Sequence, residues 1–205
     1  MRHLSFFVAV IALTWFVRDV PFFWDTVQLG SKHAHHFFEN GLRWLPLPPE
    51  IDSGHPPTFG FYLACVWAVF GKSLAVSHFA MLPFLLGIAW LLVRLSPPQP
   101  PHDGGSPHWF WLPLLALADP VLAGQMALVS PDVLLVFFFL LAVQQIYRPL
   151  RGGRGGIWLA LGILGLCLIS MRGMMVAGAC FVFRVLCLVF SINRKKEKKK
   201  KKKHN

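Results

Sequence analysis

Long apolar runs separated by short polar stretches dominate this chain. The first run covers residues 4–17, a short one covers 57–71, and a longer one covers 74–95. Further apolar runs cover about residues 109–129, 132–147, 157–170 and 174–192. A helix needs roughly 20 apolar residues to cross a bilayer, and several runs approach that length. The pattern predicts an all-α fold, a polytopic transmembrane helix bundle over residues 1–193.

The first polar stretch carries the strongest functional signal. The run 4–17 is followed by "RDVPFFWD" and not by a small-residue cleavage site, so we interpret it as an uncleaved first span. Residues 18–56 are aromatic, histidine-rich and acidic, and we expect an outer loop with interfacial helices there. Five of the nine acids of the chain lie in this loop: Asp19, Asp25, Glu39, Glu50 and Asp52.

Lysine and arginine predict which loops face the cytoplasm. Three basic groups belong inside: Arg2, the loop around Arg151, and the lysine tail. All three basic groups lie on the inner face if residues 57–95 cross the bilayer once. Residues 57–71 would then re-enter from outside or lie at the surface. The loop 18–56, Asp132 and Arg172 then share the outer face. If 57–71 crosses fully, the basic loop and the tail move outside, against the rule.

Composition supports a membrane protein and narrows the function classes. The chain is 55% hydrophobic and 14% charged, against about 25% charged in an ordinary soluble domain. Of the net charge of +11, the last twelve residues carry +8, from eight lysines, Arg194 and Glu197. We expect residues 194–205 to be a disordered basic tail, solvated or attracted to anionic lipid. No aromatic platform accompanies the tail, so we expect no nucleic-acid partner.

Cysteines and histidines give no established metal or disulfide pattern. The four cysteines lie in apolar runs without a CxxC pair, so buried reduced thiols are expected. The "HAHH" stretch holds His33, His35 and His36, which could join Asp25 around a divalent cation. Their spacing matches no established metal motif, and we expect an amphipathic interfacial helix there, with no metal and no other cofactor.

Two stretches, "FFWDTVQLGSKHAHHFFENG" and "DSGHPPTFGFYLACVWAVFGKSLAVSHF", resemble the start of a membrane glycosyltransferase with the C-type fold. The similar families are the protein O-mannosyltransferases and the bacterial aminoarabinose and related lipid-linked sugar transferases. Asp25 matches their first outer acid, and His55 with the next two prolines matches the following element. Gly71 matches the "FG" turn, and His78 stands where those families usually have arginine. "SPD", ending at Asp132, resembles a second outer acid, and the resemblance covers roughly residues 1–190.

The resemblance implies the amino-terminal module of the C-type fold and a sugar transferase that uses a polyprenyl-phosphate donor. Asp25 and Asp132 would be catalytic, because an outer carboxylate can act as general base on an acceptor hydroxyl. The departing phosphate needs positive or hydrogen-bond-donating groups. The candidates for this role are His55, Lys72, His78 and Arg172. The aromatic face of residues 57–70 would flank the polyprenyl chain.

Each candidate residue also has a plainer interpretation. Asp25 can be a solvated loop acid or a helix cap, and Asp132 can cap the helix that it opens. His55 can be an interfacial histidine and His78 a packed interior one. Arg172 can be an interfacial arginine whose head reaches water.

These interpretations leave two main function classes, and a transporter is a third, weaker alternative because no inverted repeat is evident in the sequence. In the first, the chain transfers a sugar from the lipid-linked donor to an acceptor on the outer face, as a whole enzyme or as a truncated form. In the second, it is a non-catalytic membrane protein or assembly partner derived from such an enzyme. The expected partners are the polyprenyl-phosphate-linked sugar and membrane lipids. The bacterial relatives favour a multi-pass protein of the bacterial inner membrane.

Overall fold

The computed structural model describes residues 4–43, 46–95, 119–147 and 156–204, excepting the side chains of Asp25 and residues 191–204. These residues form helices and turns, and no strand occurs among them, which confirms the all-α prediction. In chain order the elements are α1 (Leu4–Val17), α2 (Trp24–Thr26), the π-helix η1 (Val27–Ser31), α3 (Lys32–Glu39), α4 (Thr58–Phe70), α5 (Leu74–Leu95), α7 (Pro120–Ala127), α8 (Pro131–Tyr147), α9 (Ile157–Ile169) and α10 (Met171–His204). Part of the predicted run 109–129 lies outside the described residues.

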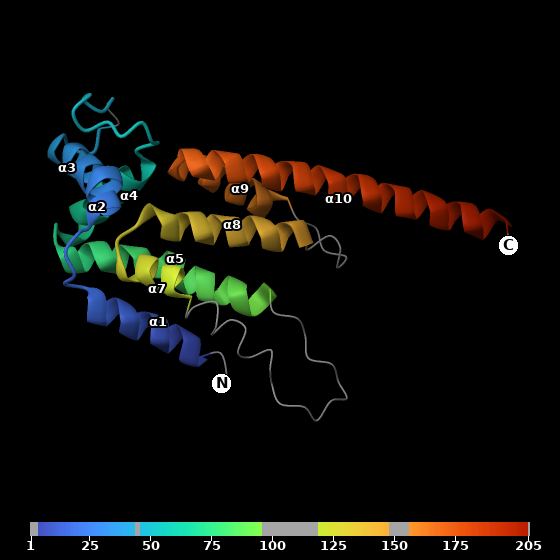
Figure 1. Ribbon diagram of the computed structural model, residues 1–205, viewed down its shortest axis with the longest axis horizontal. Helices are drawn as coiled ribbons and strands as arrows, with labels where there is room; N and C mark the ends of the chain where they lie inside the picture. The colour runs from blue at the N-terminus through green and yellow to red at the C-terminus, as the bar shows by residue number, and fades with distance from the viewer. Residues whose placement is uncertain (1–3, 44–45, 96–118, 148–155, 205) are drawn as a thin grey trace.

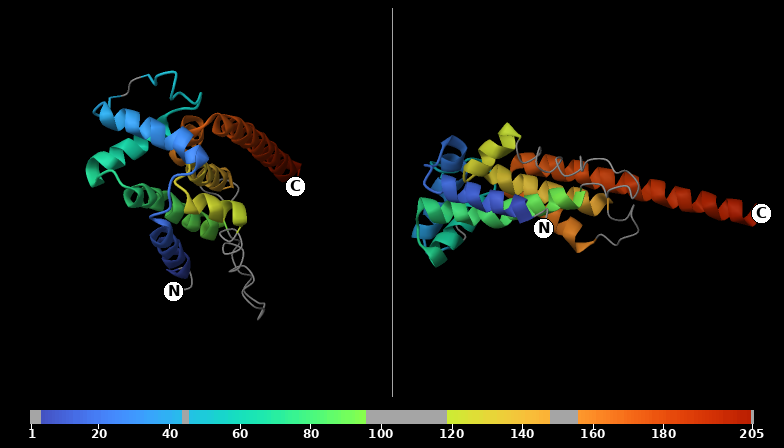
Figure 2. Two further views of the ribbon diagram at one scale, coloured as in Figure 1. Left: turned by 60° about the vertical axis from the view of Figure 1, so that its left-hand side comes forward. Right: turned by 90° about the horizontal axis from the view of Figure 1, so that it is seen from below.

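The turns that connect the helices lie at two opposite ends of the molecule. Figure 1 shows α2, α3 and α4 at one end, where α7 also leads into α8 and α9 leads into α10. We call this the loop end. The opposite end, which we call the tail end, holds the last turns of α5 and α8 and the start of α9. The two further views in Figure 2 keep α2, α3 and α4 together at one end, while α10 extends far beyond the other.

The short helix α4 stays at the loop end. Its 13 residues rise about 20 Å, less than the roughly 30 Å of a bilayer core. α9 also has 13 residues yet runs alongside α8 and α10, so length alone does not hold α4 in place. α4 packs against α3 and α5 instead. That α4 does not cross the bilayer stays a prediction.

Hydrogen bonds tie α4 to α5 after the turn between them. Trp67 Nε1 donates to Ser77 Oγ over 2.8 Å, and the Tyr62 hydroxyl donates to the Ala80 carbonyl over 2.6 Å. Gly71 ends α4 with a φ of 89°, a backbone angle that favours glycine. The "FG" turn of the sequence therefore folds the chain back on itself.

Among the described residues, two helices are long and apolar enough to cross a membrane by length and composition. They are α5 and the part of α10 from Met171 to Phe190. Much of α10 exposes apolar side chains, among them Met175 at 78% and Phe190 at 72%. Exposed apolar surface of this extent suits a lipid environment or a partner, so the two helices indicate membrane association.

The end of α10 differs from the sequence prediction of a disordered tail. The helix continues through the lysine run to His204. Lysine is a good helix former, and adding residues to an existing helix is far less costly than starting a new one. The preceding apolar part of α10 therefore supplies the start that an isolated lysine run lacks.

Glycines let α8, α9 and α10 approach closely. A Cβ on Gly162 would press on the backbone of Ala142, and one on Gly165 would collide with the Phe138 ring. A Cβ on Gly173 would collide with the Leu166 carbonyl oxygen. Small residues at such crossings are typical of helix packing in membranes. The contact at Gly173 fixes where α10 begins beside α9.

Two glycines of α10 give a matched stability prediction. Gly173→Ala should destabilise the fold by about 1–3 kcal/mol, because the new methyl group meets backbone that cannot move away easily. Gly178 has no neighbouring atom at its Cβ position, so Gly178→Ala should be neutral or stabilise by up to about 1 kcal/mol. Thermal unfolding in detergent measures both variants. Equal stability of the two variants would contradict this packing.

Candidate functional site

The first acid–base pair lies where α8 and α10 begin. Arg172 Nη2 is 3.8 Å from Asp132 Oδ1, and the two side chains are 63% and 25% exposed. Each residue follows a serine that caps its helix: Ser130 Oγ accepts from the Asp132 amide, and Ser170 Oγ accepts from the Gly173 amide. The structure thus brings together two residues that the sequence singled out separately.

This pair has complementary electrostatics. Asp132 lies in the first turn of α8, where the helix dipole favours a negative charge. Arg172 lies in the first turn of α10, where the dipole disfavours a positive one, and the nearby carboxylate offsets that cost. A carboxylate and a guanidinium side by side can accept a proton from a hydroxyl and bind a phosphate oxygen.

The loop before α4 holds His55 in a defined orientation. The Gly54 amide donates to Asp52 Oδ1 over 2.8 Å, and Gly54 has a φ of 70°. This tight turn places His55 Nδ1 3.0 Å from the Ser53 carbonyl oxygen. An acceptor at Nδ1 requires the proton there, which leaves the lone pair on Nε2 in the neutral ring. Among the described residues, no hydrogen bond or ion pair joins His55 to Asp132 or Arg172.

His33 fastens this loop to α3. Its ring is fully buried, and Nε2 lies 3.0 Å from the Ile51 carbonyl oxygen and 3.5 Å from Ser53 Oγ. The proton on Nε2 then faces Ile51, and the buried Nδ1 has no partner within the described part of the chain. Burial lowers the pKa of His33, although the Ile51 carbonyl and the Asp52 charge favour the protonated form.

Lys72 lies in an aromatic and acidic setting of its own. Its Nζ is 3.8 Å from Glu39 Oε1 and lies 5.7 Å and 5.8 Å from the ring centroids of Phe38 and Trp67. The lysine thus links the end of α3 to the turn after α4. The structure shows no contact between Lys72 and the pair Asp132–Arg172 in the residues that it covers.

His78 is an interior residue of α5. It is 3% exposed, and its Nε2 donates to the Val20 carbonyl oxygen over 3.0 Å. This bond joins α5 to the chain that follows α1. The geometry agrees with the plainer interpretation of His78 as a packed histidine, and the same bond supports the first turn of the outer loop.

Asp25 and the histidine stretch complete the predicted set. The backbone of Asp25 lies in α2, at the loop end, while its side chain lies outside what the structure describes. His35 Nδ1 lies 2.9 Å from the Ser31 carbonyl, and its ring meets Trp67 edge-on with centroids 5.0 Å apart. Within the described ranges, no group of three histidine, cysteine or acidic side chains could hold a metal ion.

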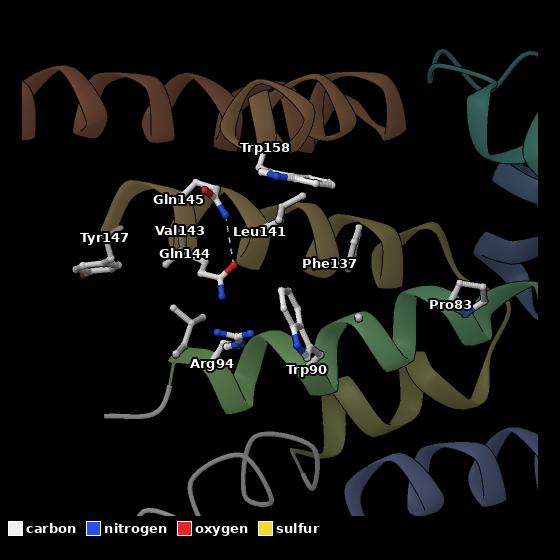
Figure 3. Close-up of a pocket in the computed structure, with 12 residues that line it drawn as sticks. Pro83, Trp90, Arg94, Phe137, Leu141, Val143, Gln144, Gln145, Tyr147 and Trp158 are labelled. Atoms are coloured by element: carbon white, nitrogen blue, oxygen red, sulfur yellow. Dashed lines mark hydrogen bonds between the residues drawn. The ribbon is translucent and has the colours of Figure 1, made fainter. Parts of the chain in front are cut away.

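A cavity that sequence reasoning missed lies at the tail end. It has a volume of about 1100 Å³ and is lined by α5 from Pro83 to Leu95, by α8 from Phe137 to Tyr147 and by Trp158 in the first turn of α9. Figure 3 shows Arg94, Trp90 and Gln144 around it. Gln144 and Gln145 interrupt an apolar run and are the signal that could have indicated it.

No family model, curated protein or solved structure matches the chain.

The buried His33 generates a pH prediction. Its pKa is lowered in the folded state, so between that value and the unfolded value of about 6.5 the unfolded chain binds more protons. Stability is then fully present above about pH 6.5 and falls as pH decreases toward the folded pKa. Thermal unfolding at pH 7.5 and 5.5 should show a smaller pH effect in His33→Gln than in the wild type. His102→Gln controls for the loss of a histidine, and an undiminished pH effect in His33→Gln would contradict the assignment.

Proposed function

We propose that this chain is the membrane-embedded, amino-terminal part of a glycosyltransferase with a C-type fold. It transfers a sugar from a polyprenyl-phosphate donor to an acceptor on the outer face of a bacterial inner membrane. The observation that carries the proposal is the grouping at the loop end: the α2 turn with Asp25, the loop with His55, and the pair Asp132–Arg172. The first two follow the motif order of the C-type enzymes along the chain.

The residues suggest a division of roles. In the proposed mechanism, Asp25 accepts the proton of the acceptor hydroxyl as that oxygen attacks the anomeric carbon. The bond from that carbon to the donor phosphate breaks, and the phosphate leaves with its negative charge. Arg172 and the free Nε2 edge of His55, when protonated, are the groups suited to that charge. Lys72 contributes positive potential while paired with Glu39.

The alternative is a non-catalytic membrane protein derived from such an enzyme. Specific contacts favour it: His78 bonds to the Val20 carbonyl, Lys72 pairs with Glu39, and Arg172 pairs with Asp132. In this alternative these residues hold the loop end together and bind no donor. The two functions differ in whether donor turnover depends on Asp25.

Asp25→Asn keeps the size of the side chain but removes its charge and most of its basicity. Release of polyprenyl phosphate from a lipid-linked sugar by the reconstituted full chain should fall by roughly 10²- to 10⁴-fold, the usual worth of general-base catalysis. Asp19→Asn is the matched control, because Asp19 is an exposed acid of the same loop paired with Arg18. Equal turnover by Asp25→Asn and Asp19→Asn would favour the non-catalytic alternative.

The variant His55→Ala tests donor binding in an assay that requires no catalysis. Polyprenyl phosphate binding to the chain in neutral nanodiscs should weaken about tenfold, the value of one charge-assisted hydrogen bond. His35→Ala serves as the control, since His35 packs on Trp67 and contacts the Ser31 backbone. Unchanged affinity in His55→Ala, measured by titration, would remove His55 from the site.

A further inference from the structure

The tail-end cavity is separate from the residues of the proposed sugar transfer. Its lining runs from Pro83 to Leu95 in α5 and from Phe137 to Tyr147 in α8, with Trp158 of α9. Asp132 and Arg172, in the first turns of α8 and α10 at the loop end (Figure 1), are not among the lining residues. The volume of about 1100 Å³ is at the upper limit of typical ligand cavities, roughly 300–1,000 Å³. The cavity is therefore large enough for a ligand other than the groups of the sugar-transfer proposal.

One cation lies at the cavity with its hydrogen-bond donors available. The Arg94 guanidinium lies 5.2 Å from the centroid of the Trp90 ring, which holds it by a cation–π contact. No carboxylate in the described part of the chain pairs with Arg94. A guanidinium offers several donors in a planar fork that matches phosphate oxygens. In Figure 3 the amide nitrogen of Gln144 points toward this guanidinium, so both can donate to one anionic group between them.

A buried polar group of the lining also lacks a partner. Gln145 is 4% exposed, and its Nε2 donates to Gln144 Oε1 over 3.4 Å. Its Oε1 has no hydrogen-bond partner among the described atoms. Leaving a buried amide oxygen unpaired is unfavourable, and this atom is closed off from solvent. The polar groups that the cavity offers to a ligand are therefore the donors of Arg94 and Gln144.

The rest of the lining is apolar and aromatic. Phe137, Leu141, Val143 and Trp158 form walls that suit a hydrocarbon chain. Tyr147 and Trp158 lie at helix ends beside the cavity, and tryptophan and tyrosine at helix ends are typical of the bilayer interface. Basic pockets between helices at that depth bind phospholipid head groups. The charge and the apolar walls together specify an amphiphile.

We propose that this cavity binds an anionic lipid. Arg94 and Gln144 donate to its phosphate, and its hydrocarbon chain lies against Phe137, Leu141 and Trp158. The site fixes the spacing of α5, α8 and α9 at the tail end. It does not depend on sugar transfer, and its binding assay requires no turnover.

Dodecyl phosphate is a suitable probe for the full chain in phosphatidylcholine nanodiscs, used below its micellar concentration. Titration should show saturable binding that weakens at least about tenfold in Arg94→Gln, because a charge-assisted pair is lost. Arg94 is exposed, so we expect Arg94→Gln to keep the fold. Arg43→Gln is the matched control, an exposed arginine at the loop end, and its affinity should equal that of the wild type.

Three further arms decide which part of the probe is recognised. Inorganic phosphate alone and dodecylphosphocholine should each bind at least about tenfold more weakly than dodecyl phosphate, since one lacks the chain and the other the net charge. Val143→Trp should reduce binding by filling the apolar part while keeping Arg94. Equal affinity in Arg94→Gln and the wild type overturns the proposal. Inorganic phosphate binding as tightly as dodecyl phosphate overturns it as well.

Discussion

The close packing of α4 on the η1–α3 segment is the contact on which the arrangement of the bundle depends. A Cβ on Gly60 would collide with the His33 side chain, and one on Gly30 would press on the Phe59 ring. Because these glycines allow the two helices to touch, α4 stays beside α3 at the loop end. The chain then leaves that end in α5, and the starts of α8 and α10 return to it (Figure 1). This arrangement brings Asp132 and Arg172 to the same end as His55.

The polar groups of the loop end are held largely by backbone contacts. His33 reaches the Ile51 carbonyl, His78 reaches the Val20 carbonyl, and Asp52 accepts from Gly54. The first two bonds join positions 18 and 58 residues apart, and the third closes a local turn before His55. The same contacts limit the catalytic interpretation, since a histidine that supports the backbone is not free to bind a phosphate. The guanidinium of Arg172 has donors besides the one near Asp132, and Nε2 of His55 can donate once the ring is protonated, so these two residues carry most of the proposal.

The sequence predicted helices well where apolar runs were bounded by turns. The ends of α1, α4 and α5 agree with the predicted runs to within one residue, because proline, glycine and charged residues mark them clearly. It could not predict that His33 anchors the loop, since the bond to Ile51 joins positions 18 residues apart. The helical lysine run was missed because composition alone does not show that an existing helix continues into it. The tail-end cavity depends on three helices meeting, which no local pattern encodes.

The central claim is that α4 does not cross the membrane, so that the outer loop and the α9–α10 turn share one face. Single cysteines at Asn40 and Met171, both exposed, test it in sealed vesicles when the four native cysteines are replaced by alanine. A membrane-impermeant maleimide should label Asn40→Cys and Met171→Cys from the same side, and Arg151→Cys from the other. Labelling of Asn40→Cys and Met171→Cys from opposite sides would contradict the account.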